Sequence, residues 1–160
     1  MSELIITFLA SYLFVGVLLS LGLWWAIDGL KDKEMIVAAV LAGVLAWFLV
    51  FVLKDILDMP RPFMVNNGKV LTMTVPWDGA FPSGHMALLF ALSTVVFFRN
   101  RRWGLVYMVA AAAVGVGRVI ANVHYPMDIL GGAVIGVVVG VMVSRFNLMS
   151  FVRKLLGKKS

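Results

Sequence analysis

The most constraining feature of this sequence is a set of long apolar stretches without charged residues. Leu4–Ile27 gives 24 consecutive uncharged positions, and Met35–Leu53 gives 19. A helix that crosses a bilayer needs roughly 20 mainly apolar residues, so both stretches are predicted to span a membrane. Of the 160 residues, 62% are hydrophobic and only 14% are charged, which is more apolar surface than a soluble domain of this size buries. The composition therefore predicts one integral membrane domain over residues 1–160.

Shorter apolar stretches complete a predicted all-α, polytopic bundle of about five spans, with a sixth helix left open. The stretch Met86–Phe98 has only 13 residues, so its helix is expected to begin further back, in the Pro-Ser-Gly-His segment Pro82–His85. The remaining predicted spans are Trp103–Gly117, continued after Arg118 by Val119–Val123, and Ile129–Val143. The last span carries glycines at four-residue spacing, a pattern that favours close helix packing: Gly132, Gly136 and Gly140.

The distribution of basic residues predicts the orientation. Five spans place the termini on opposite sides, with ten basic residues on one side and four on the other: Lys54, Arg61, Lys69 and Arg118. By the positive-inside rule, the side with ten is cytoplasmic, and the net charge of +6 reflects membrane orientation rather than a nucleic-acid partner. The first span lacks a basic n-region and is expected to stay in the mature protein. The basic tail, residues 146–160, is expected either along the inner leaflet or in solvent.

Residues typical of binding and catalytic sites are concentrated on the opposite side, which is predicted to be extracytoplasmic. Lys54, Arg61 and Arg118 provide three cations there, and a guanidinium fork matches the oxygens of a phosphate group. Ser83 and Gly84 lie where the third span begins, so a hydroxyl and free backbone N–H groups are directed at the same side. Any one of these residues alone could be an interfacial cation or a helix cap. Together they predict a phosphate-binding site.

The two histidines suggest phosphoryl transfer through a covalent intermediate. His124 can attack phosphorus through one ring nitrogen if a carboxylate holds the other, and Asp128 follows four residues later. His85 can protonate the leaving oxygen and then activate water. The chain contains no cysteine and only these two histidines, so neither a metal site nor a cofactor is expected.

Three motifs resemble those of the type 2 phosphatidic acid phosphatase family, which shares its active site with vanadium haloperoxidases. They cover residues 54–128 and consist of Lys54, six residues and Arg61-Pro62; Pro82-Ser83-Gly84-His85; and Arg118, five residues, His124, three residues and Asp128. The resemblance implies metal-independent dephosphorylation at the outer face of a bacterial cytoplasmic membrane. It also implies that His124 is the nucleophile, that Asp128 orients His124, and that His85 is the acid and base. The phosphate ligands implied are Lys54, Arg61, Ser83, Gly84 and Arg118. One departure is Gly117, where the family usually has serine; the apolar composition disfavours the soluble haloperoxidases.

The substrate is less constrained than the reaction. The sequence is most similar to small bacterial undecaprenyl-diphosphate phosphatases, whereas phosphatidylglycerophosphate, phosphatidate and lipid A phosphatases use the same motifs. The loop Phe63–Phe81 is predicted to be either a lid or headgroup selector, with Lys69 as a second phosphate contact, or a passive connector between spans. A small anion channel or transporter, or a structural assembly protein, would account for the cations or the glycines but not for the paired histidines.

The charge distribution makes the topology testable. A reporter domain fused after Ser160 is expected to be cytoplasmic, because ten of the 14 basic residues lie on the side that carries the C-terminus. Protease protection in right-side-out vesicles would measure this. An extracytoplasmic reporter would mean that the number of spans is wrong by one.

Overall fold

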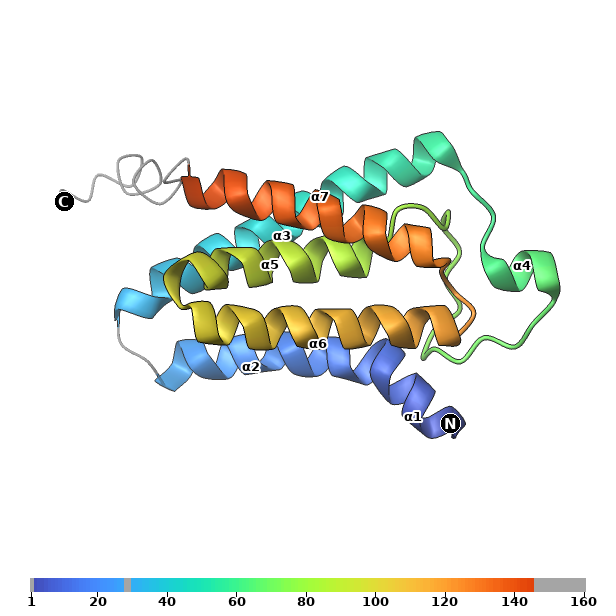
Figure 1. Cartoon of the computed structure of the whole chain (residues 1–160), viewed down its shortest axis with the longest axis horizontal. Helices are drawn as coiled ribbons and strands as arrows, with labels where there is room; N and C mark the ends of the chain where they lie inside the picture. The colour runs from blue at the N-terminus through green and yellow to red at the C-terminus, as the bar shows by residue number, and fades with distance from the viewer. Residues whose placement is uncertain (1, 28–29, 146–160) are drawn as a thin grey trace.

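The computed structural model describes residues 2–27 and 30–145, and the predicted tail, residues 146–160, lies outside them. The described chain is an elongated bundle of helices without strands (Figure 1), which confirms the all-α prediction. Its elements are α1 (Glu3–Thr7), the π-helix η1 (Phe8–Tyr12), α2 (Leu13–Ile27), α3 (Leu30–Leu57), α4 (Pro62–Asn66), α5 (Gly84–Arg99), α6 (Arg101–Ile120) and α7 (Pro126–Arg145).

The helices have the length and surface of membrane spans. Within the described residues, four helical stretches are long and apolar enough to cross a membrane, and α5 is a shorter apolar helix. The four stretches are Glu3–Ile27, Lys33–Asn66, Arg101–Ile120 and Pro126–Arg145. Large apolar side chains are exposed on the outside of the bundle, among them Leu19 (68%), Val109 (70%) and Val134 (63%). Such a surface is stable against lipid tails rather than water, so the chain is a multi-pass membrane protein.

One predicted helix start agrees with the structure, and one predicted helix end does not. Helix α5 begins at Gly84, within the Pro-Ser-Gly-His segment. Helix α7 begins at Pro126, three residues before the predicted span Ile129–Val143. Helix α6 ends at Ile120 rather than continuing to Val123. The physical reason is the turn that follows, in which Asn122 adopts a left-handed conformation with φ of 63°, a geometry that asparagine tolerates better than most residues.

Helix α5 is the central helix and packs against α3, α6 and α7. The three glycines of α7 face it: a Cβ atom at Gly132, Gly136 or Gly140 would collide with atoms of α5, at 2.6 Å from the Thr94 Cβ in the case of Gly140. The predicted packing role of these glycines is thus confirmed. Their close approach also brings the starts of α5 and α7 together, where the Ser83 N–H donates to the Asp128 carbonyl at 2.9 Å.

Buried polar side chains are concentrated at this end of the bundle. Ser93 and Thr94 are buried further along α5, where each hydroxyl donates to the carbonyl four residues earlier. In the part of the chain that the structure describes, the other buried polar residues lie near the starts of α5 and α7: Lys54, Arg61, Ser83, Arg118, His124 and Asp128. Burying several charged groups together is costly unless they are paired, and this concentration marks the candidate site.

Candidate active site

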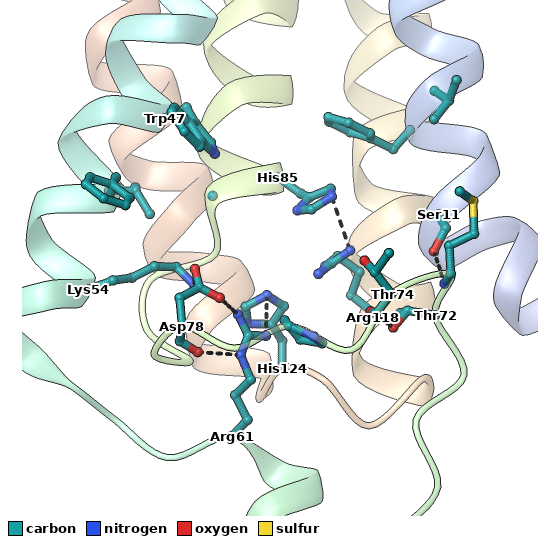
Figure 2. Close-up of a pocket in the computed structure, with 17 residues that line it drawn as sticks. Ser11, Trp47, Lys54, Arg61, Thr72, Thr74, Asp78, His85, Arg118 and His124 are labelled. Atoms are coloured by element: carbon teal, nitrogen blue, oxygen red, sulfur yellow. Dashed lines mark hydrogen bonds and ion pairs between the residues drawn. The ribbon is translucent and has the colours of Figure 1, made fainter.

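A cavity of about 260 Å³ opens among the ends of α3 and α6 and the start of α5 (Figure 2). One wall is apolar and comes from α2 and α3, and the other is polar. The apolar wall includes Phe14, Val15, Trp47, Val50 and Phe51. The polar wall includes Lys54, Arg61, Asp78, His85, Arg118 and His124. A cavity with these two walls is suited to a molecule with an apolar chain and an anionic headgroup.

The structure brings all eight predicted site residues to this one place. Six of them line the cavity: Lys54, Arg61, Gly84, His85, Arg118 and His124. The other two, Ser83 and Asp128, are buried beside it at the starts of α5 and α7. These residues come from three motifs spread over 75 positions, so their convergence depends on the tertiary structure. Their individual roles remain predictions.

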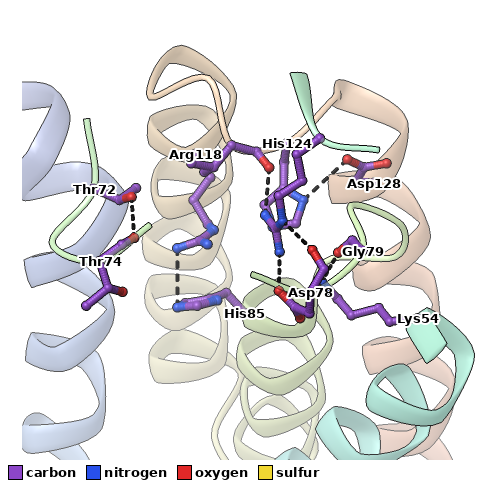
Figure 3. A network of polar contacts seen from close by, with 11 residues as sticks. Lys54, Thr72, Thr74, Asp78, Gly79, His85, Arg118, His124 and Asp128 are labelled. Atoms are coloured by element: carbon purple, nitrogen blue, oxygen red, sulfur yellow. Dashed lines mark hydrogen bonds and ion pairs between the residues drawn. The ribbon is translucent and has the colours of Figure 1, made fainter. Parts of the chain in front are cut away.

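His124 is held by a carboxylate on the following helix (Figure 3). Its Nδ1 lies 3.3 Å from the Asp128 Oδ2 atom, which also accepts the backbone N–H of Tyr125 at 2.8 Å. The other ring nitrogen, Nε2, lies 3.4 Å from the Arg61 Nη1 atom. Burial lowers the pKa of His124, as do the neighbouring cations, and together these effects outweigh the bond to Asp128, which raises it. The ring is therefore neutral near pH 7, the form in which a histidine acts as a nucleophile.

His85 and Arg118 form the opposite side of the polar wall. The His85 ring packs on Phe14 of α2, with ring centroids 4.4 Å apart, and its Nε2 lies 3.3 Å from the Arg118 Nη1 atom. The same Nη1 donates to the Ala10 carbonyl of η1 at 3.2 Å. Within the described residues, the Arg118 Nε atom and the Ser83 hydroxyl are buried without a hydrogen-bond partner. Two buried donors beside one cavity favour an anionic ligand there.

Asp78 is a site residue that sequence reasoning missed. Its Oδ2 lies 2.9 Å from Lys54 Nζ and its Oδ1 lies 2.6 Å from Arg61 Nη2, so the carboxylate bridges two predicted phosphate ligands. Burial raises the pKa of Asp78, but the hydrogen bonds and charges of Lys54 and Arg61 outweigh that effect, and the net pKa is lowered. The available signal was that Asp78 is the sole acidic residue between Phe63 and Phe81.

The structure does not bring Lys69 into the cavity, contrary to its predicted role as a second phosphate contact. Its Nζ pairs with both carboxylate oxygens of Glu3, at 2.7 and 2.8 Å, on the exposed surface. The physical reason is that the chain after α4 follows α1 and η1 at this point, where the Met73 N–H also donates to the Ser11 hydroxyl at 3.2 Å. Among the described residues there is no cluster of three or more histidine, cysteine or acidic residues that could hold a metal ion.

Residues 34–151 match the PAP2 superfamily, and this range contains all three motifs. The chain belongs to the PAP2 superfamily. It is 32% identical over 135 residues to the bacitracin transport permease protein BcrC of Bacillus licheniformis, covering 83% of this chain and 66% of that protein. It is 27% identical over 143 residues to the undecaprenyl-diphosphatase BcrC of Bacillus subtilis, covering 89% of this chain and 74% of that protein. The chain therefore spans about two thirds to three quarters of the length of these relatives.

Solved structures agree with this assignment. LpxE of Aquifex aeolicus superposes with a TM-score of 0.74 at 30% identity, covering 89% of this chain and 85% of that one. A PAP2-type phosphatidylglycerolphosphate phosphatase of Bacillus subtilis has the same fold, with a TM-score of 0.61 at 22% identity and coverage of 91% and 74%. These findings confirm the lipid phosphatase branch of the PAP2 superfamily, so the protein is a membrane-bound hydrolase of lipid phosphates.

Gly117, the departure from the family motif, has a structural explanation. A Cβ atom at this position would lie 2.7 Å from both the Ala10 backbone nitrogen and the Leu9 Cβ atom. The absence of a side chain lets η1 approach α6 closely enough for the Ala10 carbonyl to accept a hydrogen bond from Arg118. The Ala10 carbonyl thus contacts Arg118, next to position 117, where the family usually has a serine.

This contact predicts that the residue usual in the family is harmful here. Gly117→Ser is expected to lower the melting temperature in detergent and the rate of lipid phosphate hydrolysis, since overpacking a close contact costs about 1–3 kcal/mol. The matched control is Gly16→Ser in α2, where nothing lies within 4 Å of an added Cβ. A Gly117→Ser variant with the stability and activity of the Gly16→Ser control would contradict the explanation.

Proposed function

We propose that this protein dephosphorylates a membrane lipid phosphate through a phosphohistidine formed on His124. The observation that carries the proposal is the placement of two histidines in one cavity, with His124 paired to Asp128 at 3.3 Å and His85 beside Arg118 at 3.3 Å. A pocket that only bound anions would need the cations. It would have no need for a carboxylate that fixes the proton of one imidazole on Nδ1 and leaves Nε2 free to attack.

The proposed reaction has two steps that balance in atoms and charge. First, His124 Nε2 forms a bond to phosphorus while the bond to the leaving oxygen breaks, and protonated His85 gives its proton to that oxygen. Second, water attacks phosphorus, His85 takes the proton from water, and the N–P bond breaks to release inorganic phosphate. Arg118, Arg61 and Lys54 stabilise the charge that develops on the phosphoryl oxygens, together with Ser83 and the N-terminus of α5.

We further propose that residues 1–160 act as a single domain in a bacterial cytoplasmic membrane. The cavity faces the extracytoplasmic side and the C-terminus is cytoplasmic, on the support of the ten-to-four distribution of basic residues. The bilayer is then part of the catalytic environment, because a lipid substrate reaches the cavity by lateral diffusion. Nucleic acid has no part in this function, and no cofactor is required.

The substrate that we propose is undecaprenyl diphosphate, which loses its terminal phosphate to give undecaprenyl phosphate. Support comes from the relative of Bacillus subtilis, which is named an undecaprenyl-diphosphatase, and from the same name, marked putative, on YbjG of Escherichia coli. The apolar wall built by Phe14, Val15 and Trp47 suits a prenyl chain, and each buried methylene contributes roughly 0.8 kcal/mol. The alternatives are phosphatidylglycerophosphate, phosphatidate and lipid A.

Transport remains the second candidate, because the Bacillus licheniformis relative is named a transport permease. A small anion transporter would use the cations and the cavity without needing covalent chemistry. The pairing of His124 with Asp128 favours the phosphatase, and the release of phosphate by purified protein separates the two functions.

The nucleophile is tested by substitution. His124→Ala is expected to lower kcat for a lipid phosphate by at least about 10³-fold, the scale seen when a covalent nucleophile is removed, and to abolish acid-labile labelling of the protein by a radioactive substrate. The control is Tyr125→Phe, which alters the adjacent, exposed side chain outside the cavity. Labelling that survives in His124→Ala would assign the phosphohistidine to another residue.

The substrate is tested by comparing kcat/KM for four compounds on pure protein. The expected order is undecaprenyl diphosphate first, then phosphatidylglycerophosphate and phosphatidate, with a short soluble phosphate ester last. The lipids rank above the ester because the cavity has an apolar wall that a short ester cannot cover. A preference for phosphatidylglycerophosphate would overturn the headgroup assignment, and a preference for the soluble ester would overturn the role of the membrane.

A further inference from the structure

Asp78 lies where a phosphate group would be expected to bind. Its two oxygens contact two different cations, Oδ2 at 2.9 Å from Lys54 Nζ and Oδ1 at 2.6 Å from Arg61 Nη2 (Figure 2). Two phosphate oxygens would bridge the same pair of cations in the same way. Asp78 lines the cavity that His124 faces, and 34% of its side chain is exposed. The carboxylate is therefore within reach of a ligand that enters the cavity.

The backbone around Asp78 engages the same two cations. The Arg61 Nε atom donates to the Asp78 carbonyl at 2.8 Å, and Lys54 Nζ donates to the Gly79 carbonyl at 2.5 Å. The segment is attached to the end of α3 through the Ala80 N–H, which donates to the Met59 carbonyl at 2.8 Å. Trp77, by contrast, is 86% exposed. The segment 77–80 thus forms a strap that is held mainly by the two cations and is open to solvent on one side.

The polar wall of the cavity consequently has two parts. On the side of Lys54 and Arg61, the donors already bond to the strap, and Arg61 Nη1 also donates to the Val123 carbonyl at 2.7 Å. On the side of Arg118 and Ser83, the Nε and hydroxyl donors have no partner within the described part of the chain. A phosphate that bridges Lys54 and Arg61 would occupy the place of the Asp78 carboxylate, which bridges the same two cations.

We propose that Asp78 is an internal competitor for the phosphate group, which keeps Lys54 and Arg61 paired and yields them when the substrate headgroup binds. This inference rests on the proposed function of the cavity and adds a residue that sets how tightly phosphate is held. Its consequence for turnover concerns the product. When inorganic phosphate remains after hydrolysis, the carboxylate returns to the two cations and favours release of the product, because two anions cannot bridge them together.

The proposal predicts that removing a charged residue from the site strengthens anion binding. Calorimetric titration of the detergent-solubilised protein with inorganic phosphate is expected to give about tenfold tighter binding for Asp78→Asn and Asp78→Ala than for the unaltered chain. Inhibition of turnover by added phosphate should strengthen by the same factor. The matched control is Asp55→Asn, which removes the same charge from the exposed position next to Lys54, outside the cavity, and should leave phosphate binding unchanged.

Weaker or unchanged phosphate binding by the Asp78 variants would overturn the proposal. If Asp78 only orients Lys54 and Arg61, both variants will bind phosphate more weakly than the unaltered chain, or no more tightly. Absence of phosphate binding in all the proteins would overturn it as well. Titration needs no turnover, so it is independent of the hydrolysis assay that tests the proposed function on the same preparations.

Hydrogen exchange on the unaltered protein provides a test that does not depend on a variant folding. Saturating phosphate is expected to increase amide exchange over residues 77–80, including the Ala80 amide, because the strap loses its two cationic partners. Most ligands slow the exchange of the segments that they contact. Slower or unchanged exchange in this segment would overturn the displacement of Asp78.

Discussion

The close contact between α5 and α7 is the constraint on which the rest of the site depends. Three glycines on α7 remove the side chains that would separate the helices, and the Ser83 N–H then reaches the Asp128 carbonyl at 2.9 Å. The start of α5 provides His85, and the start of α7 provides the carboxylate that holds His124. A wider spacing between these two helices would separate the two imidazoles and the backbone N–H groups directed at the cavity. The geometry of the candidate site is thus set in part by packing at positions 4, 8 and 12 residues after Asp128 along α7.

The buried cations Lys54, Arg61 and Arg118 are tolerated energetically because each has hydrogen-bond partners. Arg61 bonds to backbone carbonyls and to Asp78, Lys54 bonds to the strap, and Arg118 bonds to the π-helix. Backbone carbonyls satisfy buried donors without neutralising their charge, so the cavity keeps a net attraction for anions. The two acidic partners lie on separate sides, since Asp128 contacts His124 whereas Asp78 contacts Lys54 and Arg61. In the proposed reaction, each carboxylate therefore influences a different step.

Much of this arrangement could be predicted from the sequence, for identifiable reasons. Long uncharged stretches predict membrane spans because a charged side chain in lipid is costly. The motif spacing also predicted that His124 and Asp128, four residues apart, lie close together. The start of α5 was predicted because the apolar stretch Met86–Phe98 is too short to cross a membrane, so the helix had to begin before it. The end of α6 was placed too late, because apolar residues after Arg118 continued the hydropathy pattern while Asn122 turned the chain.

Contacts made by the backbone or by an irregular loop were beyond such reasoning. The Ala10 carbonyl has no sequence signature, since it depends on a π-helix and on the approach that Gly117 permits. Asp78 lies in a segment without periodicity, so its return to Lys54 and Arg61 could not be anticipated. Lys69 was predicted to bind phosphate because of its positive charge. The sequence alone does not show that Glu3 lies close enough to pair with it.

The two walls of the cavity also differ in where they belong in the chain. Every residue predicted to handle phosphate falls within residues 34–151, the range that matches the superfamily. The apolar wall is completed by Phe14 and Val15, which lie before that range. The apolar wall therefore draws on both parts of the chain, because Trp47, Val50 and Phe51 lie within the matched range and Phe14 and Val15 lie before it. Phe14 also packs on the His85 ring, and the Ala10 carbonyl accepts a hydrogen bond from Arg118. A substitution in the first helices that reshapes the apolar wall therefore also changes the support of two predicted site residues, so that changes in substrate preference and changes in rate are expected to occur together.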